Sequence, residues 1–124
     1  MIAYVTLGTN DLDKAEVFYT ELLGTLGAKI LMQDDRMRFY GTGPGAPILS
    51  ICKPYDEKPA TAGNGTMIAL PGGSKEGVDA LYAKAIELGA SDEGEPGQRG
   101  PGFYGGYFRD LDGNKLNAFC MTRG

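Results

Sequence analysis

The sequence of 124 residues contains no histidine and only two cysteines. Histidine is the usual neutral metal ligand and the only side chain whose unperturbed pKa lies near neutrality. Without histidine, a tight zinc, nickel or iron site would need cysteines or a cluster of carboxylates. Catalytic pairs of serine or cysteine with histidine are excluded as well.

Long apolar runs and clusters of lysine and arginine are also missing. The sequence therefore predicts no membrane span, and its N-terminus lacks the basic start and the apolar stretch of a signal peptide. A net charge of −4 argues against a broad basic surface for nucleic acid. We expect a cytoplasmic protein that binds neither membrane nor nucleic acid, with Cys52 and Cys120 as reduced thiols.

The composition is that of an ordinary globular chain, with 42% hydrophobic and 23% charged residues. Its length suits one compact domain with a real hydrophobic core. The 20 glycines are concentrated between the periodic segments, which indicates tight turns and loops.

Hydrophobic periodicity predicts two amphipathic helices, over about residues 12–23 and 74–88. Asn10 or Asp11 is placed to cap the first, and Ser74 to cap the second. The apolar positions at helical spacing are Leu12, Ala15, Phe18, Tyr19, Leu22 and Leu23 in the first helix and Val78, Leu81, Tyr82, Ala85 and Ile86 in the second.

Short apolar segments rich in β-branched and aromatic residues predict strands around these helices. They cover residues 2–7, 28–32, 36–40, 47–53, 66–70, 103–109 and 115–121. The glycine- and proline-rich residues 91–102 are expected to form a long loop with at most one short strand.

The predicted order is βαβββ, linker, βαβββ, with modules over about residues 1–54 and 66–124 and a linker over about 55–65. The predicted fold class is α+β, in which two βαβββ modules of one chain form curved mixed sheets that enclose a cavity. Cys52 and Cys120 occupy matching positions when the two modules are aligned on these elements.

Three stretches of the chain resemble the vicinal-oxygen-chelate superfamily, which includes glyoxalase I, bleomycin-resistance proteins and extradiol dioxygenases. They are YVTLGTNDLDKAEVFYTELLG, GTMIALPGGSKEGVDALYAKAIELGA and GPGFYGGYFRDLDGNKLNAFCM, of which FRDLDGNKL is the most specific part. The resemblance spans nearly the whole chain. It implies a homodimer, since single-chain members of the superfamily commonly pair.

In metal-dependent members of this superfamily, four ligands project from the sheets into the cavity. The resemblance puts Tyr4, Leu49 (within one residue), Met67 and Asn117 at the corresponding positions. Phenol, thioether and carboxamide are poor ligands for a hard or borderline divalent ion, and leucine offers no donor. We therefore expect the metal site of the superfamily to be lost, and predict neither a metal nor another cofactor.

Other polar residues add to the candidate ligand site. Tyr104 and Tyr107 are predicted to contact a ligand, because buried phenols need a hydrogen-bond partner. Arg36 and Arg38 alternate along one strand and should share a face. That face could recognise a carboxylate or phosphate, although a solvated outer face is the favoured interpretation.

The function predicted from the sequence is metal-independent binding of a small molecule, in a sequestering, sensing or accessory role. The predicted ligand contacts are Tyr4, Leu49, Met67, Tyr104, Tyr107 and Asn117. One alternative is a lyase, isomerase or dioxygenase-related enzyme of the same superfamily that uses a site without histidine, although no catalytic residue can be named. Another is an interaction protein whose cavity is filled by side chains.

Overall fold

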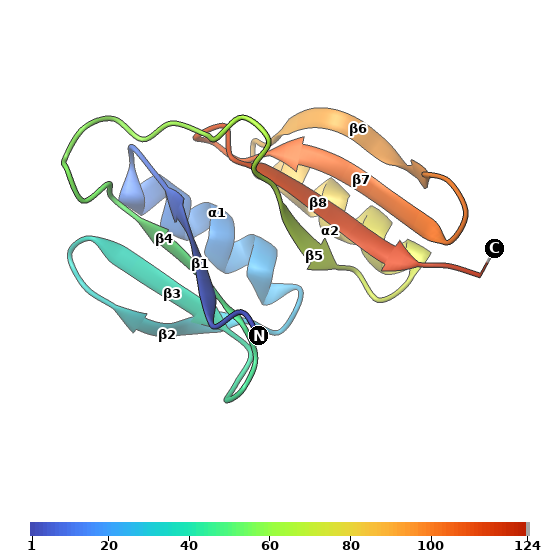
Figure 1. Ribbon diagram of the computed structural model, residues 1–124, viewed down its shortest axis with the longest axis horizontal. Coiled ribbons are helices and arrows are strands. Elements are labelled where there is room, and N and C mark those ends of the chain that lie inside the picture. The colour runs from blue at the N-terminus through green and yellow to red at the C-terminus, as the bar shows by residue number, and fades with distance from the viewer. Residues whose placement is uncertain (124) are drawn as a thin grey trace. The chain divides into compact units, whose positions relative to one another are not determined.

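The computed structural model describes residues 1–123 and divides them into two compact units, Met1–Ala62 and the residues from Gly63 onward. Each unit has the predicted order of one strand, one helix and three strands. The first unit contains β1 (Tyr4–Gly8), α1 (Leu12–Gly24), β2 (Lys29–Gln33), β3 (Met37–Gly41) and β4 (Ile48–Cys52). The second contains β5 (Ile68–Pro71), α2 (Lys75–Glu87), β6 (Ser91–Gln98), β7 (Phe103–Arg109) and β8 (Lys115–Met121). The elements are labelled in Figure 1.

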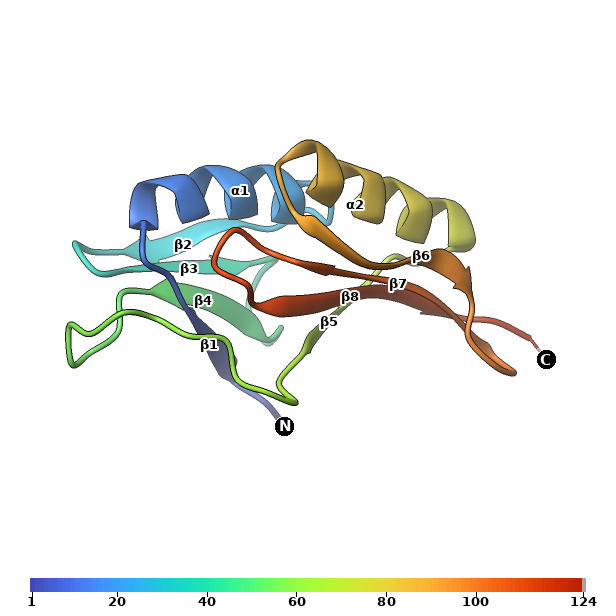
Figure 2. The same cartoon turned by 90° about the horizontal axis from the view of Figure 1, so that it is seen from above.

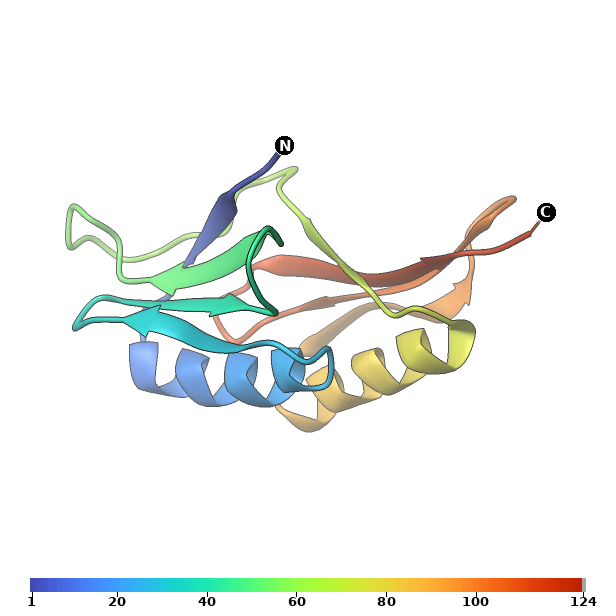
Figure 3. The same cartoon turned by 90° about the horizontal axis from the view of Figure 1, so that it is seen from below.

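Each unit forms one four-stranded mixed sheet, in the order β1-β4-β3-β2 in the first and β5-β8-β7-β6 in the second. The first and last strands of each unit are parallel neighbours, and the remaining pairs are antiparallel. Figures 2 and 3 show each helix lying along one face of the sheet of its own unit. We call the opposite face of each sheet, which no helix of the same unit covers, its open face.

Both helices begin at residues that the sequence indicated. The Asp11 carboxylate accepts a hydrogen bond from the Lys14 amide (3.1 Å), and the Ser74 hydroxyl accepts one from the Gly77 amide (3.0 Å). These bonds satisfy amide groups that have no partner inside the helix. All six apolar positions predicted for the first helix are buried in α1, whereas in α2 Ile86 remains 37% exposed.

The β6 strand corrects one prediction. Residues 91–102 were expected to be mainly loop, yet Ser91–Gln98 pairs with β7 along its length. Glycine and proline have low strand propensity, so local sequence favours a loop, but pairing with a neighbour can override that preference. Pro96 is tolerated because β6 is an edge strand whose register shifts twice.

The segment after β4 is tied to the turn between β1 and α1. The Asn10 side chain donates to the Ala60 carbonyl (3.2 Å) and accepts from the Ala60 amide (2.7 Å). Within the segment, Glu57 adopts a φ of 63°, which lies in the left-handed region that non-glycine residues rarely enter. The part of the linker before Ala62 therefore has a defined path within the first unit.

Neither helix in residues 1–123 is long and apolar enough to cross a membrane.

The Tyr82 phenol on α2 donates a hydrogen bond to the Asp92 carboxylate (2.7 Å) at the start of β6. Burial and then this hydrogen bond raise the pKa of Tyr82 to about 12. Because the pKa is raised on folding, the stabilisation is complete below the ordinary value of 10.0 and is lost as pH rises toward 12. We expect alkaline urea titrations to show a steeper loss of stability for the wild type than for Tyr82→Phe in this window. Parallel curves for the two proteins would contradict the assignment.

A candidate ligand-binding face on each sheet

The open face of the first sheet carries an aromatic pair. Tyr4 on β1 and Phe39 on β3 meet across β4, with ring centroids 5.2 Å apart and Tyr4 54% exposed. Ser50 on β4 is the register neighbour of Phe39 and is only 1% exposed. The face therefore has a small polar residue in its central strand and exposed aromatic surface beside it.

The position predicted for Leu49 is shifted by one residue. Leu49 is a register neighbour of Tyr40, which bonds to α1, so Leu49 belongs to the core side of the sheet. Because side chains alternate along a strand, its neighbour Ser50 occupies the open face. Val5 pairs with Leu49 in the first sheet, and Ile68 pairs with Leu116 at the equivalent place in the second. Ser50 and Asn117 each follow the second member of these pairs, so they occupy equivalent positions in the two units.

The one-residue error arose from aligning the two modules on their cysteines. That alignment matches Cys52 with Cys120, but the two cysteines lie on different faces of their sheets. Cys52 is two residues from Ser50, on the open face, whereas Cys120 is the register neighbour of Tyr104, which bonds to α2. An alignment on these thiols is therefore out of step by one residue.

On the second sheet, Asn117 and Tyr107 are register neighbours on the open face. The Asn117 side chain is buried, and its amide nitrogen donates to the carbonyls of Gly106 (3.0 Å) and Ala118 (3.3 Å). A Cβ atom at Gly105 would lie 3.0 Å from that nitrogen. Glycine at this position therefore leaves room for the asparagine amide against the backbone.

Tyr104 is on the other side of this sheet. Its hydroxyl donates to the Asp79 carboxylate on α2 (2.7 Å), and the Lys75 ammonium lies 5.4 Å from its ring centroid. The bond to Asp79, followed by burial, raises the pKa of Tyr104. The structure thus brings Tyr107 and Asn117 together and separates Tyr104 from them. Met67 lies just before β5 and is 41% exposed.

The positions that correspond to the superfamily's metal ligands do not carry the donors that a divalent metal would need. These positions are occupied by Tyr4 and Ser50 in the first unit and by Met67 and Asn117 in the second. Met67 directly precedes β5, the strand that pairs with β8, which contains Asn117. Within residues 1–123, no group of three or more histidine, cysteine, aspartate or glutamate residues could hold a metal ion. The amide nitrogen of Asn117 is already bonded to carbonyl oxygens. The side chains present do not fit a divalent metal, because imidazole and carboxylate are both missing from these positions.

Cys52 is the thiol on the open face of the first sheet. Burial raises its pKa, and the nearby Arg36 guanidinium opposes that effect more weakly. A thiol with a raised pKa is protonated at neutral pH and is a poor nucleophile. Cys52 therefore gives no support to covalent catalysis on this face.

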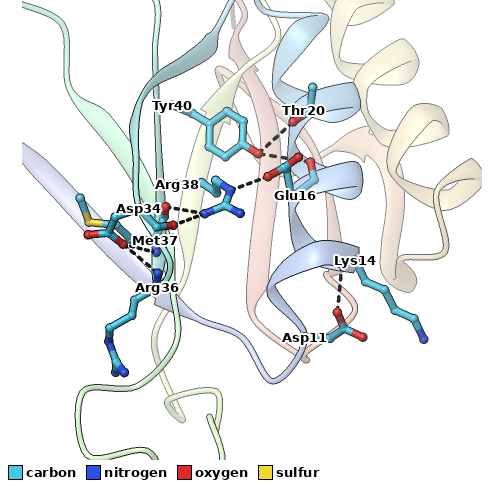
Figure 4. A network of polar contacts seen from close by, with 9 residues as sticks. All are labelled: Asp11, Lys14, Glu16, Thr20, Asp34, Arg36, Met37, Arg38 and Tyr40. Carbon is cyan, nitrogen blue, oxygen red and sulfur yellow. Dashed lines mark hydrogen bonds and ion pairs between the residues drawn. The ribbon is translucent and has the colours of Figure 1, made fainter.

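The two arginines predicted to share a solvated face have structural partners instead, as Figure 4 shows for Arg38. Arg38 forms an ion pair with Glu16 of α1 and is only 14% exposed, so a solvated face is wrong for this residue. Arg36 donates to the carbonyls of Lys53 (3.4 Å) and Pro54 (2.6 Å). Both arginines thus connect the β3 hairpin to neighbouring segments.

The same network fixes Tyr40 under α1. Its hydroxyl is 2.9 Å from the Thr20 hydroxyl and donates to the Glu16 carbonyl at 3.2 Å (Figure 4). Burial raises the pKa of Tyr40, and the hydrogen bond with Thr20 partly offsets the rise. These contacts give Tyr40 a structural role on the core side of the sheet.

A surface hollow of about 510 Å³ lies in the first unit, which the sequence did not predict. It is bounded by the β1–α1 turn, the β2–β3 turn and the segment after β4. Asp35, Lys53, Glu57 and Lys58 contribute charges to it, and none of them forms an ion pair within residues 1–123. Sequence reasoning missed the hollow because residues 54–65 have the composition of a linker. Their path depends on contacts between segments far apart in the sequence, such as the bonds of Asn10 with Ala60 and of Arg36 with Pro54.

The chain is an α+β protein of the class built from two βαβββ units, each with one mixed four-stranded sheet and one helix. The model of the Glyoxalase/Bleomycin resistance protein/Dioxygenase superfamily matches residues 1–118. The chain belongs to this superfamily.

One solved structure supports the same assignment, and a second shares the fold. A glyoxalase/bleomycin resistance protein from Albidiferax ferrireducens T118 is 38% identical, with a TM-score of 0.87 over 96% of this chain and 97% of that one. A lactoylglutathione lyase from Agrobacterium tumefaciens is 21% identical, with a TM-score of 0.70 over 96% of this chain and 92% of that one. At that identity the second similarity shows the fold alone. No curated protein matches the chain.

Proposed function

We propose that the protein binds a small molecule on the open faces of its sheets without a metal ion. Its role would be sequestration, sensing or assistance to another protein rather than Lewis-acid catalysis. The proposed contacts are Tyr4, Ser50 in place of Leu49, Met67, Tyr107 and Asn117. Tyr104 is left out because its phenol bonds to α2.

The observation that carries the proposal is the chemistry of the residues at the superfamily's metal positions. Tyr4 offers an exposed aromatic ring beside Phe39, and Asn117 is a fixed polar amide in the second sheet. Aromatic surface with a few fixed polar groups is typical of sites for small organic ligands. A metal would require anionic or imidazole donors, and Tyr4, Ser50, Met67 and Asn117 provide neither.

We also propose that the protein is a cytoplasmic homodimer. Several large apolar side chains are exposed in the single chain, including Ile2, Tyr4, Met32 and Met121. Where such side chains form a contiguous patch, a partner often covers them. Cys52 and Cys120 are both free, which agrees with a reducing compartment.

Elemental analysis of untagged protein tests metal independence. We expect far less than one equivalent of any transition metal, and no change in melting temperature with about 1 mM Mg²⁺, Mn²⁺, Ni²⁺ or Zn²⁺. A site with a Kd of about 1 µM would stabilise the fold by about 4 kcal/mol under these conditions, which raises the melting temperature by roughly 10 °C or more. Stoichiometric metal, or such a shift, would contradict the proposal.

Ligand binding is tested on the same batch by a thermal screen of small aromatic compounds. Compounds that stabilise the wild type should stabilise Tyr4→Ala much less. Val17→Ala is the matched control, since Val17 is an exposed apolar residue on α1. If no compound stabilises the wild type, or if both variants respond equally, the proposed role of Tyr4 fails.

A further inference from the structure

Tyr107 on the open face of the second sheet lies against two cationic side chains. The Arg99 guanidinium carbon is 5.7 Å from the centroid of its ring, and the Lys115 ammonium nitrogen is 5.4 Å from it. Both distances are within the range of a cation–π interaction. The aromatic ring thus places two positive charges beside the position of Asn117.

The position of Arg99 depends on glycines in β6. A Cβ atom at Gly97 would lie 2.9 Å from one terminal nitrogen of the guanidinium, and a Cβ at Gly94 would lie 3.2 Å from the other. With no side chains at these positions, Arg99 folds back over the strand and donates to the Glu95 carbonyl. The guanidinium is therefore held over Tyr107 rather than extended into solvent.

Neither cation is neutralised by a carboxylate. Within residues 1–123, Arg99 and Lys115 form no ion pair, whereas the neighbouring Arg109 pairs with Glu93. The open face thus carries two uncompensated positive charges in a chain whose net charge is −4. One Arg99 nitrogen donates to the Glu95 carbonyl, and the remaining guanidinium N–H groups and the Lys115 ammonium are able to donate hydrogen bonds to an anion.

An aromatic pair lies farther along the same face. Phe103 on β7 and Phe119 on β8 stack with ring centroids 5.6 Å apart and planes 4° apart. Phe103 is four residues from Tyr107, which corresponds to about 13 Å along an extended strand. The Phe103 ring extends over Gly105, where a Cβ atom would lie 2.8 Å from it, and Asn117 is the polar register neighbour of Tyr107.

We infer that this face recognises a small aromatic molecule that carries a carboxylate or a similar anionic group. The rings of the ligand contact Phe103 and Phe119, and its anionic group is bound by Arg99 and Lys115. The inference rests on the proposed function and adds the chemical class of the ligand.

The test is an NMR titration of the ¹⁵N-labelled full chain with three probes. The probes are 2-naphthoate, the uncharged 2-naphthamide, and inorganic phosphate as an anion without rings. We expect naphthoate to bind about tenfold more tightly than either other probe, with shifts at Tyr107 and Asn117. Arg99→Gln and Lys115→Gln should each remove most of the difference between naphthoate and naphthamide.

Two further variants separate charge from position. Gly97→Ala keeps both charges but displaces the guanidinium, so it should weaken naphthoate about as much as Arg99→Gln does. Lys84→Gln removes a positive charge on α2, where Lys84 pairs with Glu87, and should leave binding unchanged. Equal loss of binding in Lys84→Gln would show a general charge effect and overturn the inference.

The outcomes distinguish this inference from the proposed function. Equal affinity for naphthoate and naphthamide at this face would overturn anion recognition and leave small-molecule binding supported. Equal affinity for phosphate and naphthoate would overturn the aromatic part. Absence of binding by every probe would overturn the inference, while the metal analysis and the ligand screen decide the proposed function separately.

Discussion

Gly77→Ala is expected to destabilise the second unit by more than about 3 kcal/mol, although alanine is ordinarily the better helix former. A Cβ atom at Gly77 would lie 1.9 Å from the Gly72 carbonyl oxygen and 3.3 Å from the Ser74 hydroxyl. The carbonyl is backbone, so relief requires the turn before α2 to move. That movement also disturbs the cap, because the Gly77 amide donates to Ser74.

Gly24→Ala is the matched control. Gly24 is the last residue of α1, and a Cβ atom there would meet nothing within 4 Å. Removing glycine at an unstrained helical position stabilises a protein by up to about 1 kcal/mol. Urea unfolding of both variants measures the contrast. Similar stabilities for the two would show that the turn before α2 adapts at little cost.

Asn117→Asp is expected to cost about 3–5 kcal/mol at neutral pH. Asn117 is 1% exposed, and its amide nitrogen donates to two carbonyl oxygens. An ionised carboxylate would replace that donor with negative charge facing the same oxygens. The pKa of the new carboxyl should be raised on folding, so the deficit should shrink as pH falls through that raised value.

Chemical unfolding over a range of pH measures this effect. Gln98→Glu is a control for the same amide-to-acid change, since Gln98 is an exposed residue at the end of β6. Its cost should stay below about 1 kcal/mol. A deficit for Asn117→Asp that is small, or that does not depend on pH, would mean that the amide is not a required donor.

The helices and the order of elements could be predicted from the sequence, because their signals are local. In α1 the 3.6-residue period of apolar side chains and an acidic cap at Asp11 agree with one another. Ser74 and the apolar face of α2 gave the same agreement in the second unit.

The site was harder to predict, because it depends on strand register. An error of one residue in the predicted alignment of the two units named Leu49 instead of Ser50. Leu49 lies on the core side of the sheet, whereas Ser50 lies on the open face. The side of the sheet on which Tyr104 lies was also not apparent, because the aromatic residues of β7 do not show a clear alternation in sequence. Tyr107 and Asn117 were placed together because their strands form a hairpin with recognisable turn residues.

The cations beside Tyr107 had no signal in the sequence. Arg99 lies in a segment rich in glycine and proline, and its position depends on pairing of β6 with β7. Only the backbone shows that glycines 94 and 97 leave space for its guanidinium. Tertiary pairing overrode local propensity here, as it did for β6 itself.

The position of β4 between β1 and β3 also has a consequence during protein synthesis. Of the strands in the first unit β1 is synthesised earliest, but β4, its only sheet neighbour within residues 1–123, is made about forty residues later. Until β4 emerges, β1 has no strand to pair with, and the β2–β3 hairpin lacks its third strand. The nascent first unit therefore exposes the edge of β1 while most of that unit is being translated, and chaperones that bind extended apolar segments would have their longest access there.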